Sequence, residues 1–269
     1  MKQLSGPTMK KSHVFAMFLA LAVLAFFALW PLNPAPAAQT DISAFKPGEK
    51  LIMKLYWEFV PAGEATLTVL PDTVIKGEPA RHFMLTIKTN NFADTFYKVR
   101  DRVDAYTDLA MTRSLRYVKS QHEGSSHHEV TVDFDWKNNK ALFTEDGRAE
   151  KPTGISPGTF DPLSFFYRLR LMSLAAGSSV TLPITDGKKH VEAIGRVLKT
   201  EQMEVIGKKR KVALFEPELK HVGGVFKQSP NAKLHIWFSD DDKKIPVRIK
   251  SGVVVGNFTA RLIEARNVW

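Results

Sequence analysis

The chain has 269 residues, of which 44% are hydrophobic and 25% charged, and its formal net charge at pH 7 is +10. This composition is typical of a folded globular protein and excludes an intrinsically disordered chain. The sequence contains no cysteine, which excludes disulfide bonds, thiolate catalysis, cysteine metal sites and a lipid anchor on cysteine.

Residues 1–37 have the pattern of an export signal. Three lysines precede an unbroken apolar run at 14–30, and an Ala-Pro-Ala segment ends at Ala37, where a signal peptidase requires small residues. A retained membrane anchor is the alternative. The apolar run is shorter than the about 20 residues of a spanning helix, however, and prolines follow it at once. We therefore expect cleavage after Ala37 and a single periplasmic domain over residues 38–269.

The expected mature chain is basic. Cleavage after Ala37 removes three lysines and no acidic residue, so the net charge falls from +10 to +7. Basic exported proteins tend to associate with anionic lipids or envelope polymers, although a charge of this size also serves ordinary solubility. No nucleic-acid-binding fingerprint is present. We predict that this chain is a monomer. Its expected partners are an anionic lipid, an envelope polymer or an envelope protein.

Alternating apolar and polar residues dominate residues 38–269 and predict half-buried antiparallel strands. The clearest run alternates at Leu51, Met53, Leu55, Trp57 and Phe59. Further runs occur at 65–69, 83–87, 130–134, 234–238, 245–249 and 258–262. Turns are predicted at 60–63, 76–77, 138–139, 146–147, 186–187 and 206–207, where Gly, Pro, Asn or Asp interrupt the runs. The pattern predicts about a dozen strands.

One apolar helix is predicted near 161–175. Asp161 suits an N-cap and Pro162 the first helical position. Apolar residues then surround nearly the whole axis as far as Gly177, and the charged residues of this segment are Arg168 and Arg170. A helix of this composition is usually buried. We expect it to pack on the sheet or across one mouth of it.

About a dozen strands with one helix favour a mainly β fold, a strongly curved antiparallel meander that forms a barrel or half-barrel. So many strands cannot stay flat and open without curling. A two-sheet β-sandwich is the alternative. A transmembrane barrel is not expected, because the last strand carries Arg261, Glu264 and Arg266 on both of its faces, whereas lipid-facing positions are apolar.

A family resemblance rests on three segments of the chain. They read VPAGEATL at 60–67, FDPLSFFYRLR at 160–170 and IWFSDDDKKIPV at 236–247. In this order they resemble the landmarks of a bacterial exported family, domain-of-unknown-function family 3108. The resemblance spans nearly all of residues 38–269. It implies an envelope protein with a β-rich fold, and it implies no reaction.

The densest group of metal-ligating side chains lies at 122–129, HEGSSHHE. If residues 124–126 form a hairpin turn, His122 lies across from His127 or His128, and a site for Zn²⁺ or Cu²⁺ becomes feasible. Alternation sends His127 and His128 to opposite faces, so at most one of them joins a given site. Exposed histidines at a polar hairpin end are the simpler interpretation, and a metal-dependent hydrolase using this cluster remains an alternative function.

The two helix arginines do not form one clamp, because two helical positions point about 200° apart. One of Arg168 and Arg170 is therefore expected to face the interior. An ion pair with a buried acid is the favoured interpretation, and contact with an anionic ligand head group is the alternative.

No nucleophile elbow and no HExxH zinc motif is present in the sequence, so we expect neither an enzyme nor a cofactor. We expect a binding or carrier protein whose apolar concave face takes a lipid-like or other amphiphilic ligand. Arg168 and Arg170 are expected at the rim of this face. The residues expected to line it are the aromatic residues Trp57, Phe59, Phe83, Phe134 and Phe238. An assembly factor that docks envelope proteins on exposed sheet edges is the alternative.

Overall fold

The computed structural model describes residues 44–218, 233–253 and 256–268. The predicted export signal at 1–37 therefore lies outside the described residues. Within them, fifteen strands form one antiparallel sheet. The strands are β1 (Lys50–Trp57), β2 (Val60–Ile75), β3 (Glu78–Thr89), β4 (Arg100–Asp108), β5 (Ser114–Glu123), β6 (Ser126–Asp135), β7 (Lys140–Glu145), β8 (Arg148–Ala149), β9 (Thr153–Gly154), β10 (Ser179–Thr185), β11 (His190–Val205), β12 (Lys208–Pro217), β13 (Lys233–Ser239), β14 (Pro246–Val253) and β15 (Gly256–Arg266).

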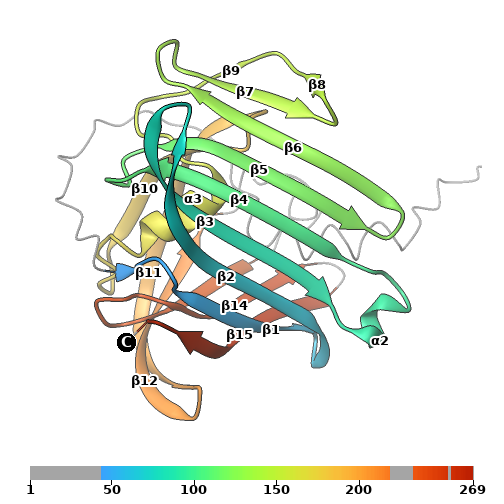
Figure 1. Cartoon of the computed structure of the whole chain (residues 1–269). Helices are drawn as coiled ribbons and strands as arrows, with labels where there is room; N and C mark the ends of the chain where they lie inside the picture. Colours follow the sequence, from blue (N-terminus) through green and yellow to red (C-terminus); the bar gives the residue numbers. More distant parts are fainter. Residues whose placement is uncertain (1–43, 219–232, 254–255, 269) are drawn as a thin grey trace, which may run out of the picture.

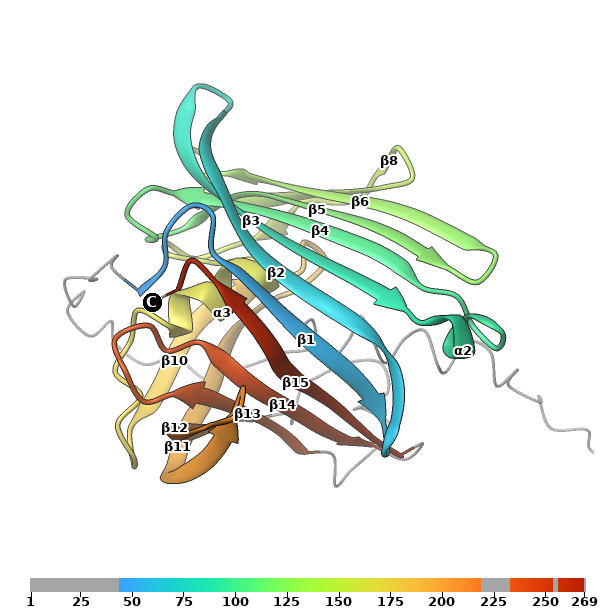
Figure 2. The same cartoon turned by 60° about the horizontal axis from the view of Figure 1, so that its bottom comes forward.

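The sheet is a meander in which β15 returns to pair with β1. Its order is β10-β11-β12-β13-β14-β15-β1-β2-β3-β4-β5-β6-β7-β8, and β9 pairs with β7. The sheet curves around the helix α3 (Pro162–Leu169), while the short helix α2 (Asn91–Asp94) connects β3 to β4 (Figures 1 and 2). The predicted curved antiparallel meander is confirmed, with more strands than the predicted dozen and without the two layers of a sandwich.

Five of the predicted turns separate strands. They join β2 to β3, β6 to β7, β7 to β8, β10 to β11 and β11 to β12. Lys76, Asn139, Asp146 and Ile206 adopt positive φ angles of 50°, 51°, 49° and 48° in four of them, the backbone twist that tight hairpins require.

The first hairpin differs from the prediction. Its turn consists of Glu58 and Phe59, not residues 60–63, and Glu58 has a φ of 52°. Gly63 instead lies within β2, where an added Cβ would be 2.2 Å from the backbone oxygen of Lys88. This glycine therefore permits a close approach of β2 to β3 and does not form a turn.

The predicted helix exists, but it ends at Leu169 instead of continuing to about residue 175. Asp161 caps its start as predicted, with its side chain accepting hydrogen bonds from the backbone N–H groups of Leu163 (3.0 Å) and Ser164 (2.8 Å). At its end, the backbone N–H of Arg170 donates to Tyr167 O, and a tighter turn follows. The Arg170 side chain at this end of the helix is fully buried.

The helix fills one part of the concave face. It packs against β3, β4 and β10. Tyr167 stacks on Phe83 of β3 with ring centroids 4.0 Å apart, and Phe45 meets both rings edge-on. Phe166 lies 5.7 Å from Phe238, centroid to centroid. These contacts form a solid aromatic core at this end of the sheet.

The two ends of the meander are bridged where β7 approaches the β10–β11 turn. Lys188 in this turn pairs with Glu145 and Glu150, each at 2.9 Å. The Thr153 hydroxyl donates to Gly187 O at 2.7 Å. The fold is therefore an incomplete barrel whose gap is crossed by side-chain contacts at this position.

Candidate ligand-binding pocket

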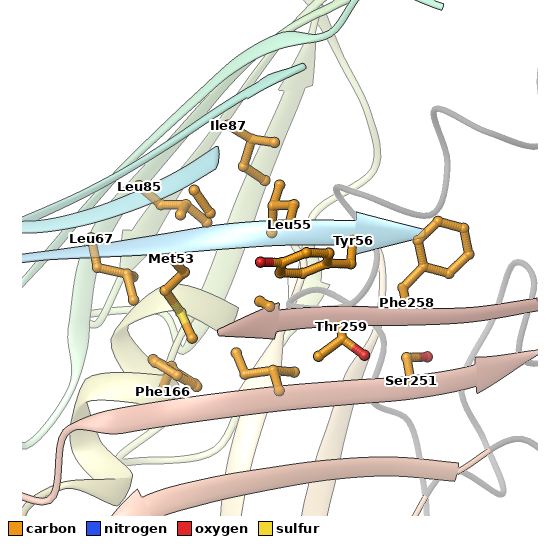
Figure 3. A pocket seen from close by; sticks show the side chains of 13 residues that line it. Met53, Leu55, Tyr56, Leu67, Leu85, Ile87, Phe166, Ser251, Phe258 and Thr259 are labelled. Atoms are coloured by element: carbon orange, nitrogen blue, oxygen red, sulfur yellow. The ribbon is translucent and has the colours of Figure 1, made fainter. Parts of the chain in front are cut away.

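An apolar pocket lies on the concave face beside α3 (Figure 3). Its empty volume is about 660 Å³, a figure that includes space open to solvent. Strands β14, β15, β1, β2 and β3 form its wall, and Phe166 of α3 closes one side. The side chains that define it include Met53, Leu55, Leu67, Leu85, Ile249 and Phe258.

Strand register brings these apolar side chains together. Met53 of β1 is paired with Ala65 of β2, which is paired in turn with Ile87 of β3. In the other direction, Leu55 is paired with Ala260 of β15. Directly paired residues of antiparallel strands point to the same face. The wall is thus a continuous apolar surface across five neighbouring strands.

The pocket exists because the helix is shorter than the strands it covers. Eight helical residues extend about 12 Å, whereas a strand of 12 residues such as β3 extends about 40 Å. Phe83 of β3 therefore stacks on the helix residue Tyr167, while Leu85 and Ile87, further along the same strand, line the pocket. In Figure 3, Phe166 and Phe258 mark opposite ends of the pocket.

Charged side chains continue the same inner face beyond the apolar wall. Asp101 of β4 is paired with the lining residue Ile87. Lys119 of β5 is paired with Val103, which is paired with the lining residue Leu85. At about 4.8 Å per strand, Lys119 lies about 10 Å from the apolar wall. One side of the pocket is therefore flanked by ionisable groups.

Asp101 and Glu123 form a pair of neighbouring carboxyl groups. The Asp101 side chain is 5% exposed and accepts a hydrogen bond from the backbone N–H of His122 at 3.0 Å. Burial, and then the charge of Asp101, raise the pKa of Glu123 to about 7. Burial also raises the pKa of Asp101 and lowers the pKa of Lys119. Below a pH of about 7 the pair therefore retains one proton beside a half-buried lysine.

The sequence profile of a family described as protein of unknown function (DUF3108) matches residues 53–263. This chain belongs to that family. The matched segment extends from β1 into β15, so it includes the whole described pocket wall. Among curated proteins, none matches the sequence.

One solved structure shares the fold of this DUF3108 protein, and two others are more distantly similar. A β-barrel-like protein of the domain of unknown function DUF1849 from Brucella abortus is 13% identical, with a TM-score of 0.53, covering 81% of this chain and 96% of that one. A Bacteroides fragilis protein with a YmcC-like fold, predicted to be exported, is 9% identical with a TM-score of 0.37, covering 82% and 97%. A predicted lipoprotein from Parabacteroides distasonis is 9% identical with a TM-score of 0.31, covering 82% and 96%. The first of these supports the barrel-like architecture.

Three of the five aromatic residues predicted to line the concave face are buried in the solid core of the DUF3108 protein. Phe83 and Phe238 have 0% exposure and Phe134 has 7%. Phe83 and Phe238 pack against α3, and Phe134 stacks on Trp136 at 5.8 Å. They point inward as predicted, but the helix and neighbouring side chains occupy the space in front of them. They do not line this pocket.

The other two predicted lining residues are exposed. Trp57 is 43% and Phe59 is 86% exposed. The turn at Glu58 and Phe59 places Phe59 outside β1, whereas Trp57, the last residue of β1, is paired with the lining residue Phe258. Phe59 therefore lies in the hairpin turn and not on the concave wall, which corrects the prediction. Trp57 shares the face of Phe258 at the end of the wall, and its contact with a ligand stays a prediction.

The two helix arginines have different surroundings. Arg170 is 0% exposed and its guanidinium donates to both carboxylate oxygens of Glu49 at 2.5 and 2.9 Å, and to the backbone oxygens of Ala44 and Lys243 at 2.9 and 3.0 Å. This confirms the favoured ion pair and corrects the alternative of Arg170 as a ligand contact at the rim. Arg168 is half-buried, and burial lowers its pKa. Its proposed contact with a ligand stays a prediction.

The histidine cluster forms a hairpin end, as predicted. His122 is paired with His127, with ring centroids 4.6 Å apart. His128 points to the other face, where its Nδ1 lies 3.0 Å from Asp146 Oδ2. Among the residues that the structure describes, no three His, Asp or Glu side chains are arranged to hold a metal ion. The predicted site at His122, His127 and His128 therefore lacks the necessary ligands there.

Sequence reasoning missed the groups that matter most in this site. The lining residues Met53, Leu55 and Leu85 were predicted to face inward but were not distinguished from other inward residues. Asp101 and Lys119 lie on strands that were not assigned individually. A usable signal is the spacing of Asp101, which lies two and four positions before the buried residues Val103 and Ala105. In a strand this spacing places the Asp101 carboxyl group on the inner face.

Proposed function

We propose that this protein is a non-catalytic envelope protein that binds an amphiphilic ligand in the apolar pocket. The observation that carries the proposal is the open apolar wall across β14, β15, β1, β2 and β3, which α3 leaves uncovered. An envelope location rests on the export pattern of residues 1–37. Within the described ranges, no helix is long and apolar enough to cross a bilayer.

The pocket suits a single hydrocarbon chain. Its lining combines flexible Met and Leu side chains with the rings of Phe166 and Phe258, and it offers few hydrogen-bonding groups. Burying about ten methylene groups contributes about 8 kcal/mol, and part of this is offset by the lost freedom of the ligand. We therefore expect micromolar rather than nanomolar affinity.

The flanking charges favour an anionic head group at neutral or lower pH. Lys119 supplies a cation on the inner face, and protonated Glu123 supplies a hydrogen-bond donor instead of a second negative charge. Above a pH of about 7, Glu123 becomes a carboxylate beside Asp101. Two carboxylates repel an anionic head group, so affinity should decrease from pH 6 to pH 8, the interval that includes this pKa.

The first experiment purifies residues 38–269 and identifies bound lipid by mass spectrometry, followed by titration with a fluorescent fatty acid. Ala260→Trp places an indole in the pocket wall and should abolish binding. Ala149→Trp is the matched control, because Ala149 is exposed on the short edge strand β8. Lipid-free protein that does not bind the probe would contradict the proposal, and so would equal binding by both variants.

The alternative of an assembly factor docking on sheet edges has less support. At one edge, β8 has two residues. At the other edge, β10 is bridged to Phe160 through Ile184 and through a hydrogen bond from Thr185 N to Phe160 O at 2.8 Å. Short or covered edges resist strand addition.

A further inference from the structure

Three connections meet at the end of the sheet that lies away from α3. They are the β1–β2 turn, the segment of α2, and the start of β15. Glu58 N donates to Asn257 O at 2.7 Å, which joins the first turn to β15. Asn90, which caps α2, donates through its backbone to Ala62 O at 2.9 Å and through its side chain to Pro61 O at 2.7 Å. Figures 1 and 2 both show α2 and the β1–β2 turn at this end.

Large aromatic side chains project into solvent from these connections. Phe59 is 86% exposed, Phe96 is 72% exposed and Phe92 is 60% exposed. Phe92 and Phe96 contact each other edge-on with ring centroids 5.4 Å apart. Isolated exposed apolar residues are ordinary, but several gathered at one end mark a surface that contacts a partner. We call Phe59, Phe92 and Phe96 the rim aromatics.

A row of cations crosses β1, β15 and β14, and its member on β1 lies four residues before the first turn. Lys54 of β1 is paired directly with Arg261 of β15, and Arg261 is paired with Arg248 of β14. Like charges directly opposite one another destabilise a sheet. In the described part of the chain no carboxylate forms a salt bridge with any of these three, although Lys54 is also paired directly with Glu64 of β2. Lys98, two residues from Phe96, is also exposed.

The acidic residues at the same end are already engaged. Glu58 accepts a hydrogen bond from Asn257 N at 2.7 Å. Glu64 pairs with Lys88 at 3.4 Å and Asp94 with Arg100 at 2.7 Å. The surface that remains for a partner is therefore aromatic at its tips and positive on its flank.

We propose that the rim aromatics dock this protein on the surface of an anionic lipid bilayer. Aromatic side chains on projecting turns enter the boundary between head groups and acyl chains, and lysine and arginine beside them bind lipid phosphates. A protein partner fits less well, because Phe59 projects from one connection and the contacting pair Phe92 and Phe96 from another, with a row of cations on the flank. This inference does not depend on whether the pocket holds a ligand.

The test is sedimentation of residues 38–269 with vesicles, since the apolar run at 14–30 would bind lipid by itself. One set of vesicles contains phosphatidylglycerol and phosphatidylethanolamine, and the other contains phosphatidylcholine alone. We expect binding to the anionic vesicles that is weakened about tenfold in Phe59→Ser/Phe96→Ser. Val74→Ser is the matched control, because Val74 is 61% exposed near the β2–β3 turn, and it should bind like the wild type.

The contribution of charge is tested separately with Lys54→Glu/Arg261→Glu, which should also weaken binding to the anionic vesicles about tenfold. Raising the salt concentration to about 0.5 M should have the same effect. The proposal is overturned if the protein does not sediment with anionic vesicles. It is also overturned if the phenylalanine variant binds them as well as Val74→Ser does. A dimer in solution that Phe59→Ser/Phe96→Ser dissociates would assign the surface to a second copy and would likewise overturn it.

Discussion

Replacing Arg170 with methionine should destabilise the fold by about 3–5 kcal/mol, the usual cost of leaving one member of a buried ion pair without its partner. Glu49 is 1% exposed and Arg170 is 0% exposed, so water cannot solvate the remaining carboxylate. The change also removes the donors to the backbone oxygens of Ala44 and Lys243. These contacts join the start of the described chain, the end of α3 and the β13–β14 connection.

The assay is urea unfolding of residues 38–269, with thermal unfolding as a second measure. A domain of this size loses about 2–4 °C in Tm per kcal/mol, so Arg170→Met should lower Tm by about 6–20 °C. The double variant Glu49→Leu/Arg170→Met replaces the pair by apolar side chains and should recover much of the loss. Stability of Arg170→Met within about 0.5 kcal/mol of the wild type would refute the reasoning, because it would mean that the buried carboxylate needs no cation.

Other changes test separate parts of the structure. The folded state binds a proton at Glu123 more tightly than the unfolded state, in which the pKa of this group is 4.5. The free energy of unfolding should therefore fall as the pH rises from 4.5 to about 7. Glu123→Gln should remove this fall of about 1–3 kcal/mol in urea unfolding, and an unchanged pH profile would contradict the assignment. Asp161→Ala removes the N-cap of α3 and should cost about 1–2 kcal/mol by the same measurement, whereas a neutral effect would show that the cap is dispensable. Gly63→Ala should cost about 1–3 kcal/mol, because its Cβ would meet the Lys88 backbone 2.2 Å away; a stable variant would show that β2 can move away from β3.

The curved meander could be predicted because hydrophobic alternation repeats in many strands. Runs such as Phe83, Leu85 and Ile87 have one buried face, and glycine or asparagine turns separate the strands. The prediction failed where alternation was interrupted by local geometry. At the first hairpin, a shift after Leu55 and a tight turn at Glu58 put Phe59 into solvent, while Gly63 resembled a turn residue although it serves close packing between strands.

The pocket could not be located from the sequence, because an inward apolar residue has the same pattern whether it meets a neighbour or empty space. Phe83 and Leu85 are two positions apart on β3, yet the first stacks on Tyr167 and the second lines the pocket. The position at which α3 ends determines which inward residues of β3 it covers and which it leaves lining the pocket. The partner of Arg170 was equally hidden, since Glu49 is 121 residues away in the chain.

The decisive test of pocket occupancy is to locate a bound ligand. Crystals of residues 38–269 grown with a fatty acid that carries bromine at its methyl end would give an anomalous signal at the end of the hydrocarbon chain. We expect a bromine peak inside the pocket, between Phe166 and Phe258, with the carboxyl group directed toward the side of Lys119. A peak outside the concave face, or an empty pocket at saturating ligand, would contradict it.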